Sequence, residues 1–196
     1  MADRMTKEQR HRCMSHIRSK DTRPEVLVRK SLFAAGFRYR LNVKALPGTP
    51  DIVLKKYHTI ILINGCFWHG HEGCRHFVLP QTNRQFWEEK ISRNRRRDTA
   101  VLARLEALGW KVLTVWECEL EPARRTGTLE SLPRKIMECS RQHEMEAAQR
   151  KRLRAERREE REAEKVRKSL ARDEIYNRYE IPKRIMTESE KYDQNI

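Results

Sequence analysis

DIVLKKYHTIILINGCFWHGHEGC, residues 51–74, decides the architecture of this chain because it joins two apolar segments to a loop rich in metal-ligating and aromatic side chains. Residues 51–54 open with Asp51 and continue as an apolar run, and residues 59–63 are almost entirely apolar. Such runs are typical of strands near the centre of a sheet. We therefore expect two neighbouring strands, with a candidate active centre where the second strand passes into the loop.

The segments on either side predict two helices and two further strands. Thr22-Arg-Pro-Glu25 has the pattern of a capping box with proline in the first turn, and a helical apolar face follows until Gly36. Residues 37–43 alternate apolar and polar side chains, as a half-buried strand does. A long helix is expected over residues 83–108 and a buried strand over residues 111–116.

The order of these elements indicates an α/β protein. A helix is followed by three strands, the loop, a second helix and a final strand. The first strands are close enough along the chain to form a meander, whereas the last two are joined by a crossover helix and should pair in parallel. We expect a single α/β domain with a mixed central sheet flanked by helices.

The charge of the chain favours a polyanionic partner. The formal net charge is +15, of which residues 1–120 carry +11. Lysine and arginine that neutralise phosphates release condensed counterions, which drives binding to nucleic acid. The alternative is that the charge only aids solubility, but the basic residues cluster near the motifs described here.

Other features of the composition indicate a protein of the cytoplasm. The five cysteines are an odd number grouped with histidines, which suits a reducing compartment and a metal better than disulfides. No apolar run approaches the length of a membrane span, and the N-terminus lacks the apolar core of a signal peptide. We expect a soluble protein without membrane contact, and a monomer, because no oligomer seam is visible.

The composition changes after Pro122. Residues 123–135 contain Gly127 and Pro133 and are expected to form a loop, and residues 135–172 are dense in arginine, glutamate, alanine and lysine. This second segment predicts a solvated helix held by weak ion pairs, with too few apolar positions for a coiled coil. We expect a domain over residues 1–122 and a charged, mostly helical or disordered extension over 123–196, favoured to have no activity of its own.

The central loop has the ligands of a structural zinc site. Cys66, His71 and Cys74, joined by Cys118 just past the last strand, form a set of one nitrogen and three sulfur donors. Tetrahedral Zn²⁺ takes such sets, and four protein ligands leave no position open for catalysis. His76 is an alternative ligand to His71. The competing interpretation is a group of unlinked buried cysteines.

Asp51 and His69 are candidates for chemistry, each with a simpler alternative. A carboxylate among basic residues can hold Mg²⁺, which bridges to substrate phosphates and orients a hydroxide. From the residues alone, this role and that of a turn-capping aspartate are evenly balanced for Asp51. His69 can take a proton from water near neutral pH, or can be a surface histidine without a role. For Glu25, helix capping is the favoured interpretation.

The aromatic residues of the loop suggest contact with DNA. Phe67 and Trp68 are adjacent, and on an irregular loop both cannot easily be buried. Aromatic side chains on a basic protein can wedge between base pairs, and Trp87 is a candidate to join them. For each residue alone, ordinary packing is the favoured interpretation, and Met14 alone is best explained as a small packing contact.

Five motifs resemble the very short patch repair (Vsr) endonucleases and occur in collinear order between Met5 and Leu120. They are RSKDTRPE (18–25), PGTPDIV (47–53), NGCFWHGHEGC (64–74), FWEEKISRN (86–94) and LGWKVLTVWECEL (108–120). The resemblance implies a restriction-endonuclease-like fold and a Mg²⁺-dependent nick on the 5′ side of the T in a T·G mismatch. It implies double-stranded DNA as the partner, with other mismatch repair proteins as further candidates.

The resemblance also assigns roles to particular residues. Asp51 becomes a Mg²⁺ ligand together with the backbone carbonyl of Ile63, His69 becomes the general base, and Glu25 gains a supporting catalytic role. Cys66, His71, Cys74 and Cys118 become the structural Zn²⁺ site. The residues implied to contact DNA are Phe67, Trp68 and Trp87 as a major-groove wedge, Met14 as a minor-groove wedge, and Lys90 and Asn94 as base-reading positions.

The chain departs from the family pattern at Glu72-Gly73, which lengthens the loop before Cys74, at Ile63-Asn64, and in its charged extension. These departures leave open the sequence context recognised around the mismatch, and none of them involves Asp51, His69 or the aromatic wedge. Separately, two other functions stay open. One is a zinc-stabilised DNA-binding module without cleavage, and the other is a related nickase with a different DNA target.

Overall fold

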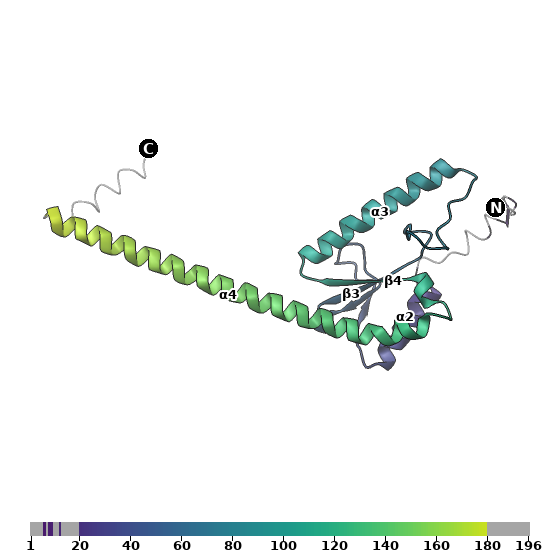
Figure 1. Cartoon of the computed structure of the whole chain (residues 1–196), viewed down its shortest axis with the longest axis horizontal. Coiled ribbons are helices and arrows are strands. Elements are labelled where there is room, and N and C mark those ends of the chain that lie inside the picture. Colours follow the sequence, from purple (N-terminus) through teal and green to yellow (C-terminus); the bar gives the residue numbers. More distant parts are fainter. Residues whose placement is uncertain (1–5, 7, 10–11, 13–19, 180–196) are drawn as a thin grey trace. The chain divides into compact units, whose positions relative to one another are not determined.

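The computed structural model describes residues 6, 8–9, 12 and 20–179, so the predicted DNA contact Met14 lies outside the described residues. Its elements follow the expected order (Figure 1). In chain order they are α2 (Arg23–Ala34), β1 (Arg40–Leu41), β2 (Ile52–Leu54), the 3₁₀-helix η1 (Lys55–Tyr57), β3 (Thr59–Asn64), α3 (Arg84–Ala107), β4 (Lys111–Trp116), the 3₁₀-helix η2 (Glu117–Leu120) and α4 (Arg125–Tyr179).

The strands form one mixed sheet in the order β1-β2-β3-β4. β1 and β2 are antiparallel, as are β2 and β3, where Ile52 lies opposite Ile61. β3 and β4 are parallel, with Thr59 opposite Lys111 and Asn64 opposite Trp116. The predicted meander and the parallel pair joined by a crossover helix are both confirmed.

Helices cover both faces of this sheet, as Figure 1 shows for α3 on one side and α2 on the other. Successive side chains of a strand point to opposite faces, so a strand buried on both sides needs a continuous apolar run. One face packs against α3 through Val53, Ile60 and Leu105. The core on the other face joins the sheet to α2 and to the start of α4, and its buried residues are Val28, Leu32, Phe37, Ile52, Leu54, Ile61, Val115, Leu120, Leu132 and Ile136.

The start of α2 differs from the predicted capping box. Thr22 occupies the N-cap position, but its hydroxyl donates to Glu25 Oε1 at 2.8 Å and does not accept a backbone N–H. Glu25 reaches back as expected, although it accepts the N–H of Asp21 at 3.1 Å. The guanidinium of Arg29, 2.6 Å from Glu25 Oε2, holds the carboxylate in this position.

The first strand is shorter than the predicted segment 37–43, because only Arg40 and Leu41 pair with β2. At one end, Phe37 is buried and its N–H donates to the Leu32 carbonyl, which ties it to the end of α2. At the other end, Asn42 adopts a left-handed conformation with φ of 47°, which turns the chain out of the strand.

The prediction of a loop over residues 123–135 is wrong, because α4 begins at Arg125 and continues through Gly127 and Pro133. A proline inside a helix costs about 3 kcal/mol. However, Leu132 and Ile136 are fully buried, and burying each such side chain stabilises by about 1.5–3 kcal/mol. Burial against the sheet therefore outweighs the local preference for a break.

The chain divides into two compact units, Met1–Met145 and Glu146–Ile196. The first unit extends beyond the boundary expected at residue 122 because the start of α4 completes the core. In the described part of the second unit, α4 continues to Tyr179. The side chains of residues 146–172 are exposed and form ion pairs such as Lys168 with Glu164 at 2.8 Å. None of the described helices has an apolar stretch long enough to cross a lipid bilayer.

Candidate active site and metal centre

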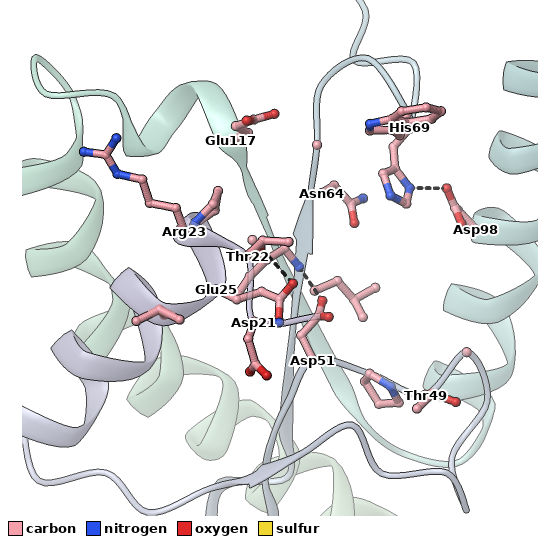
Figure 2. A pocket seen from close by; sticks show the side chains of 18 of the residues that line it. Asp21, Thr22, Arg23, Glu25, Thr49, Asp51, Asn64, His69, Asp98 and Glu117 are labelled. Carbon is pink, nitrogen blue, oxygen red and sulfur yellow. Dashed lines mark hydrogen bonds and ion pairs between the residues drawn. The ribbon is translucent and has the colours of Figure 1, made fainter. Parts of the chain in front are cut away.

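A cleft of about 1320 Å³ opens in the first unit, where the beginning of β2 meets the end of β3. The first turn of α2 forms one wall and the middle of α3 forms the other. Figure 2 shows Asp51, Glu25 and His69 among the side chains that line it. The four residues predicted for catalysis or Mg²⁺ binding, Asp51, Ile63, Glu25 and His69, are therefore together in one cleft, although they come from distant parts of the chain.

Asp51 is half-buried directly before β2, and its Oδ2 accepts the backbone N–H of Ile63 at 2.8 Å. Burial raises the pKa of the Asp51 carboxyl, and the nearby charge of Glu25 acts in the same direction, against the lowering effect of the Ile63 N–H, Arg29 and His69. A bound cation would offset the cost of keeping this carboxylate charged. The N–H and C=O of a strand residue face the same neighbour, so the Ile63 carbonyl also faces the side of Asp51.

Glu25 is buried in the wall of the cleft and fully engaged by its neighbours. Its carboxylate accepts from the Thr22 hydroxyl, the Asp21 N–H and the Arg29 guanidinium. Arg29 is itself buried and also pairs with Asp21. This network fixes the first turn of α2 beside Asp51, which suits a positioning role for Glu25.

His69 follows β3 in the loop, and its Nδ1 lies 2.6 Å from Asp98 Oδ2 on α3 (Figure 2). The contact leaves Nε2 as the nitrogen available to a substrate or water, because the other nitrogen of the ring is held by the carboxylate. Sequence reasoning missed Asp98. One feature of the sequence could have identified it: Asp98 is a carboxylate that directly follows the basic segment Arg93–Arg97.

Gly70, which has a φ of 62°, allows the loop that follows β3 to pack closely against α3. A Cβ at this position would come within 2.8 Å of Ile91 Cγ2 and 2.9 Å of Arg95 Cδ. Glycine allows both the backbone conformation and the close approach. It therefore helps to place His69 opposite Asp98.

The four predicted zinc ligands come together at the far end of the loop. One donor atom from each of Cys66, His71, Cys74 and Cys118 lies within 4.8 Å of the others. His71 Nδ1 is 3.4 Å from Cys66 Sγ and 3.5 Å from Cys118 Sγ. Tetrahedral zinc with bonds of about 2.0–2.3 Å separates its ligands by roughly 3.5–3.8 Å, so the donor set fits such an ion.

The surroundings of this cluster disfavour free thiolates at Cys66 and Cys118, so a bound cation would have to offset the cost of their negative charge. Burial raises the pKa of the Cys66 thiol to about 12, and burial also raises the pKa of Cys118. The backbone N–H of His76 lowers the pKa of the Cys74 thiol. The His76 side chain is engaged elsewhere, since its Nε2 lies 2.5 Å from Glu121 Oε1, and it is not part of the ligand group.

The predicted DNA-contacting aromatics form one half-buried cluster. The Phe67 ring packs edge-on against Trp68 at 5.3 Å and against Trp87 at 5.2 Å, measured between ring centroids. Lys90 Nζ lies 5.4 Å from the Trp68 centroid and 5.5 Å from that of Trp87. Asn94 donates from Nδ2 to the Trp68 carbonyl at 2.9 Å, so its amide supports the loop.

Comparisons with known proteins give a consistent result. A family model described as DNA mismatch endonuclease Vsr matches residues 2–75. The type II nicking enzyme V.XorIIP of Xanthomonas oryzae pv. oryzae is 46% identical over 140 residues, which is 71% of this chain and all of that protein. The DNA mismatch endonuclease Vsr of Escherichia coli K12 is 41% identical over 138 residues, which is 70% of this chain and 87% of that protein. The type II nicking enzyme V.NmeAIP of Neisseria meningitidis is 52% identical over 121 residues, covering 62% of this chain and 86% of that protein.

Proposed function

Since the chain belongs to the Vsr family of DNA mismatch endonucleases and is a DNA endonuclease, we propose that it nicks one strand of duplex DNA on the 5′ side of the T in a T·G mismatch, as the step that starts very short patch repair. The observation that carries this proposal is the cleft in which Asp51, the Ile63 backbone and the His69–Asp98 pair lie together. We also propose that the first unit has the restriction-endonuclease-like fold.

The side chains that line the cleft support hydrolysis of a phosphodiester. Asp51 and the Ile63 carbonyl would hold Mg²⁺, which, when bound, neutralises charge on the phosphate and favours attack by hydroxide. In this proposed step, His69 Nε2 accepts a proton from the attacking water, and the water oxygen forms a bond to phosphorus. The bond between phosphorus and the leaving backbone oxygen breaks, and that oxygen takes up a proton from solvent. Asp98 holds the imidazole in position, and Glu25 with Arg29 fixes the wall beside Asp51.

The cysteine and histidine cluster would bind Zn²⁺ in a structural role. All four positions of a tetrahedral ion would be filled by protein ligands, which leaves none for substrate. Two of the ligands, Cys66 and His71, flank His69 in the chain, and Cys118 lies in η2 beyond β4. A metal at this point would therefore connect the catalytic loop to the end of the sheet.

The aromatic cluster would read the mismatch by deforming the duplex. Unstacking costs a few kcal/mol per base step, and it costs least at a mismatched pair. Lys90 would add a positive charge beside the rings for contact with DNA. Asn94 would act by holding Trp68 in place, a more indirect role than the base reading that the family resemblance implies.

Replacing Asp98 by Asn should lower kcat about 100-fold at unchanged KM, because positioned acid–base groups contribute about 10²–10⁴-fold. Asparagine keeps the size of the side chain but can donate to Nδ1, which allows the wrong tautomer of His69. Steady-state kinetics on a mismatched duplex measure both constants, and Asp98→Glu should recover part of the rate. A rise in KM at unchanged kcat would assign Asp98 to DNA binding instead.

Replacing Trp68 by Ala should reduce the preference for T·G over T·A duplexes by at least about tenfold, while affinity for matched DNA changes by less than about threefold. Competition binding with the two duplexes gives both values. The matched control is Phe86→Ala, an aromatic residue that contacts Trp87 but is 55% exposed. Equal losses on both duplexes would make Trp68 a packing residue.

The reaction is tested with a duplex that carries one T·G mismatch and a different label on each strand. With Mg²⁺, we expect a single break in the strand that contains the T, and no break when Mg²⁺ is omitted. Several relatives are named type II nicking enzymes, so one-strand cleavage of another target is the second candidate. Cleavage of both strands, or cleavage without a divalent cation, would contradict the proposed reaction.

A further inference from the structure

In the second unit, the basic and acidic side chains of α4 lie on different sides of the helix. The overall composition of the segment does not reveal this arrangement. Between Glu146 and Tyr179 the helix has 12 basic and 8 acidic residues. Because each residue of an α-helix is rotated by about 100° from the one before it, their positions around the axis follow from the sequence. Nine basic residues fall within an arc of about 120°, namely Arg150, Lys151, Arg154, Arg157, Arg158, Arg161, Lys165, Lys168 and Arg172.

We call this arc the basic face. All 8 acidic residues of the segment lie outside it, together with the three remaining arginines, Arg152, Arg167 and Arg178. A helix that needed charge only for solubility would gain nothing from this separation, since mixed signs serve solubility equally well. The separation also has a cost in self-repulsion, because like charges at i, i+4 destabilise a helix.

The basic face is available to a partner. Arg154, Arg157 and Arg161 are exposed, and none of them has a carboxylate partner among the residues that the structure describes. Arg150, Lys165 and Lys168 pair with acidic residues at the margin of the face, at 3.9, 2.9 and 2.8 Å. Such exposed pairs contribute about 0–1 kcal/mol each, so phosphates can replace them at little cost.

The length of the face is close to that of one turn of duplex DNA. From Arg150 to Arg172 the helix rises by about 33 Å, since each residue adds about 1.5 Å. One turn of B-DNA is about 34–36 Å long, and the duplex carries one negative charge per roughly 1.7 Å of axis. A helical row of arginines and lysines over this length can therefore neutralise several phosphates at once.

We propose that the basic face of α4 binds the phosphate backbone of duplex DNA without reading its sequence. The proposal rests on the proposed function, which makes DNA the polyanion that this chain meets. Binding along the face would add counterion release, and therefore affinity, to the contacts of the first unit. The proposal gives this part of α4 a binding partner, whereas the sequence pattern alone favoured a solvated extension without a function of its own.

The test compares two triple variants of the full chain that differ only in the face they alter. R154Q/R157Q/R161Q removes three charges from the basic face, and R152Q/R167Q/R178Q removes three from outside it. Glutamine has nearly the helix propensity of arginine, and circular dichroism checks that both variants keep the helix. Fluorescence anisotropy gives the affinity for a fully matched 30-bp duplex between 50 and 200 mM salt, with no divalent cation added.

Three lost phosphate contacts should reduce the slope of log K against log salt by about 2.7. Affinity of the wild type should thus fall about 40-fold more than that of the basic-face variant over this range, whereas the control variant should follow the wild type. Equal effects of the two variants, or no effect of either, would overturn the proposal. A basic-face effect found on duplex RNA or anionic vesicles but not on DNA would overturn the choice of partner.

The result of this binding experiment can be interpreted even if the chain does not nick mismatched DNA. The experiment uses matched DNA and measures binding only, so neither the mismatch preference nor the cleft enters the result. A chain that nicks T·G duplexes but shows no face dependence would remove this proposal alone. A chain that shows the face dependence but nicks nothing would remove the proposed reaction alone.

Discussion

Replacing Asp51 by Asn should slow nicking of a T·G duplex by at least about a thousandfold while leaving affinity for that duplex nearly unchanged. A metal ion in such a site stabilises the transition state by several kcal/mol, and about 4 kcal/mol corresponds to a thousandfold in rate. Asparagine keeps an oxygen that accepts the Ile63 N–H, so the local structure should persist. Only the charge that would hold the cation is lost.

This variant also has a predicted effect on stability that separates it from a folding defect. Burial raises the pKa of the Asp51 carboxyl, which means that the folded protein disfavours its charged form. A neutral asparagine should therefore fold at least as stably as the wild type in the absence of divalent cations. Single-turnover rates, duplex affinity and Tm give the three readouts, with Glu117→Gln as a control carboxylate in the same cleft. Nicking within tenfold of the wild-type rate would exclude Asp51 from the metal site.

Replacing Cys118 by Ser should release the proposed structural zinc and abolish nicking together. The other three ligands lie in the loop 66–74, and Cys118 connects them to the end of the sheet through η2. Structural zinc contributes about 10–16 kcal/mol of apparent binding energy in zinc-finger peptides. A loss of about 4 kcal/mol here would lower Tm by roughly 8–16 °C for a chain of this size. His69 would lose its position because it lies between two of the ligands.

The matched control is Cys139→Ser, the same substitution at a buried free cysteine outside the ligand group. Metal analysis of the purified protein should give about one zinc per chain for the wild type and the control, and far less for Cys118→Ser. Zinc content that stays unchanged in Cys118→Ser would remove this residue from the ligand set. Equal zinc loss in both variants would point to a general loss of packing.

The residues that could be predicted from the sequence share strong local patterns. The strand 111–116 and the apolar run 59–63 are identified by continuous apolar residues, and their parallel pairing follows from the helix between them. The residues proposed as metal ligands within the loop, Cys66, His71 and Cys74, are recognisable by their spacing. To predict that Cys118 joins this group, we also have to assume that the ends of neighbouring strands in one sheet lie close together. The positions of the four donor atoms support that assumption.

The features that were mispredicted or missed depend on contacts between distant segments. The helix through Pro133 forms because Ile136 reaches the core, and no local pattern reports that burial. The first strand is short because Phe37 turns inward to pack with α2. Asp98 is 29 residues from its partner His69, so their contact emerges only when the loop is seated on α3.

The measurement that tests the central claim most directly compares two duplexes of identical sequence that differ in one base pair. One carries the T·G mismatch and the other carries C·G at the same position, in several flanking contexts. With Mg²⁺ and the full chain, we expect a nick on the 5′ side of the T in the mismatched duplex, and none in the matched duplex over the same time. Equal cleavage of both duplexes, or none in any context, would contradict the assignment as a mismatch endonuclease.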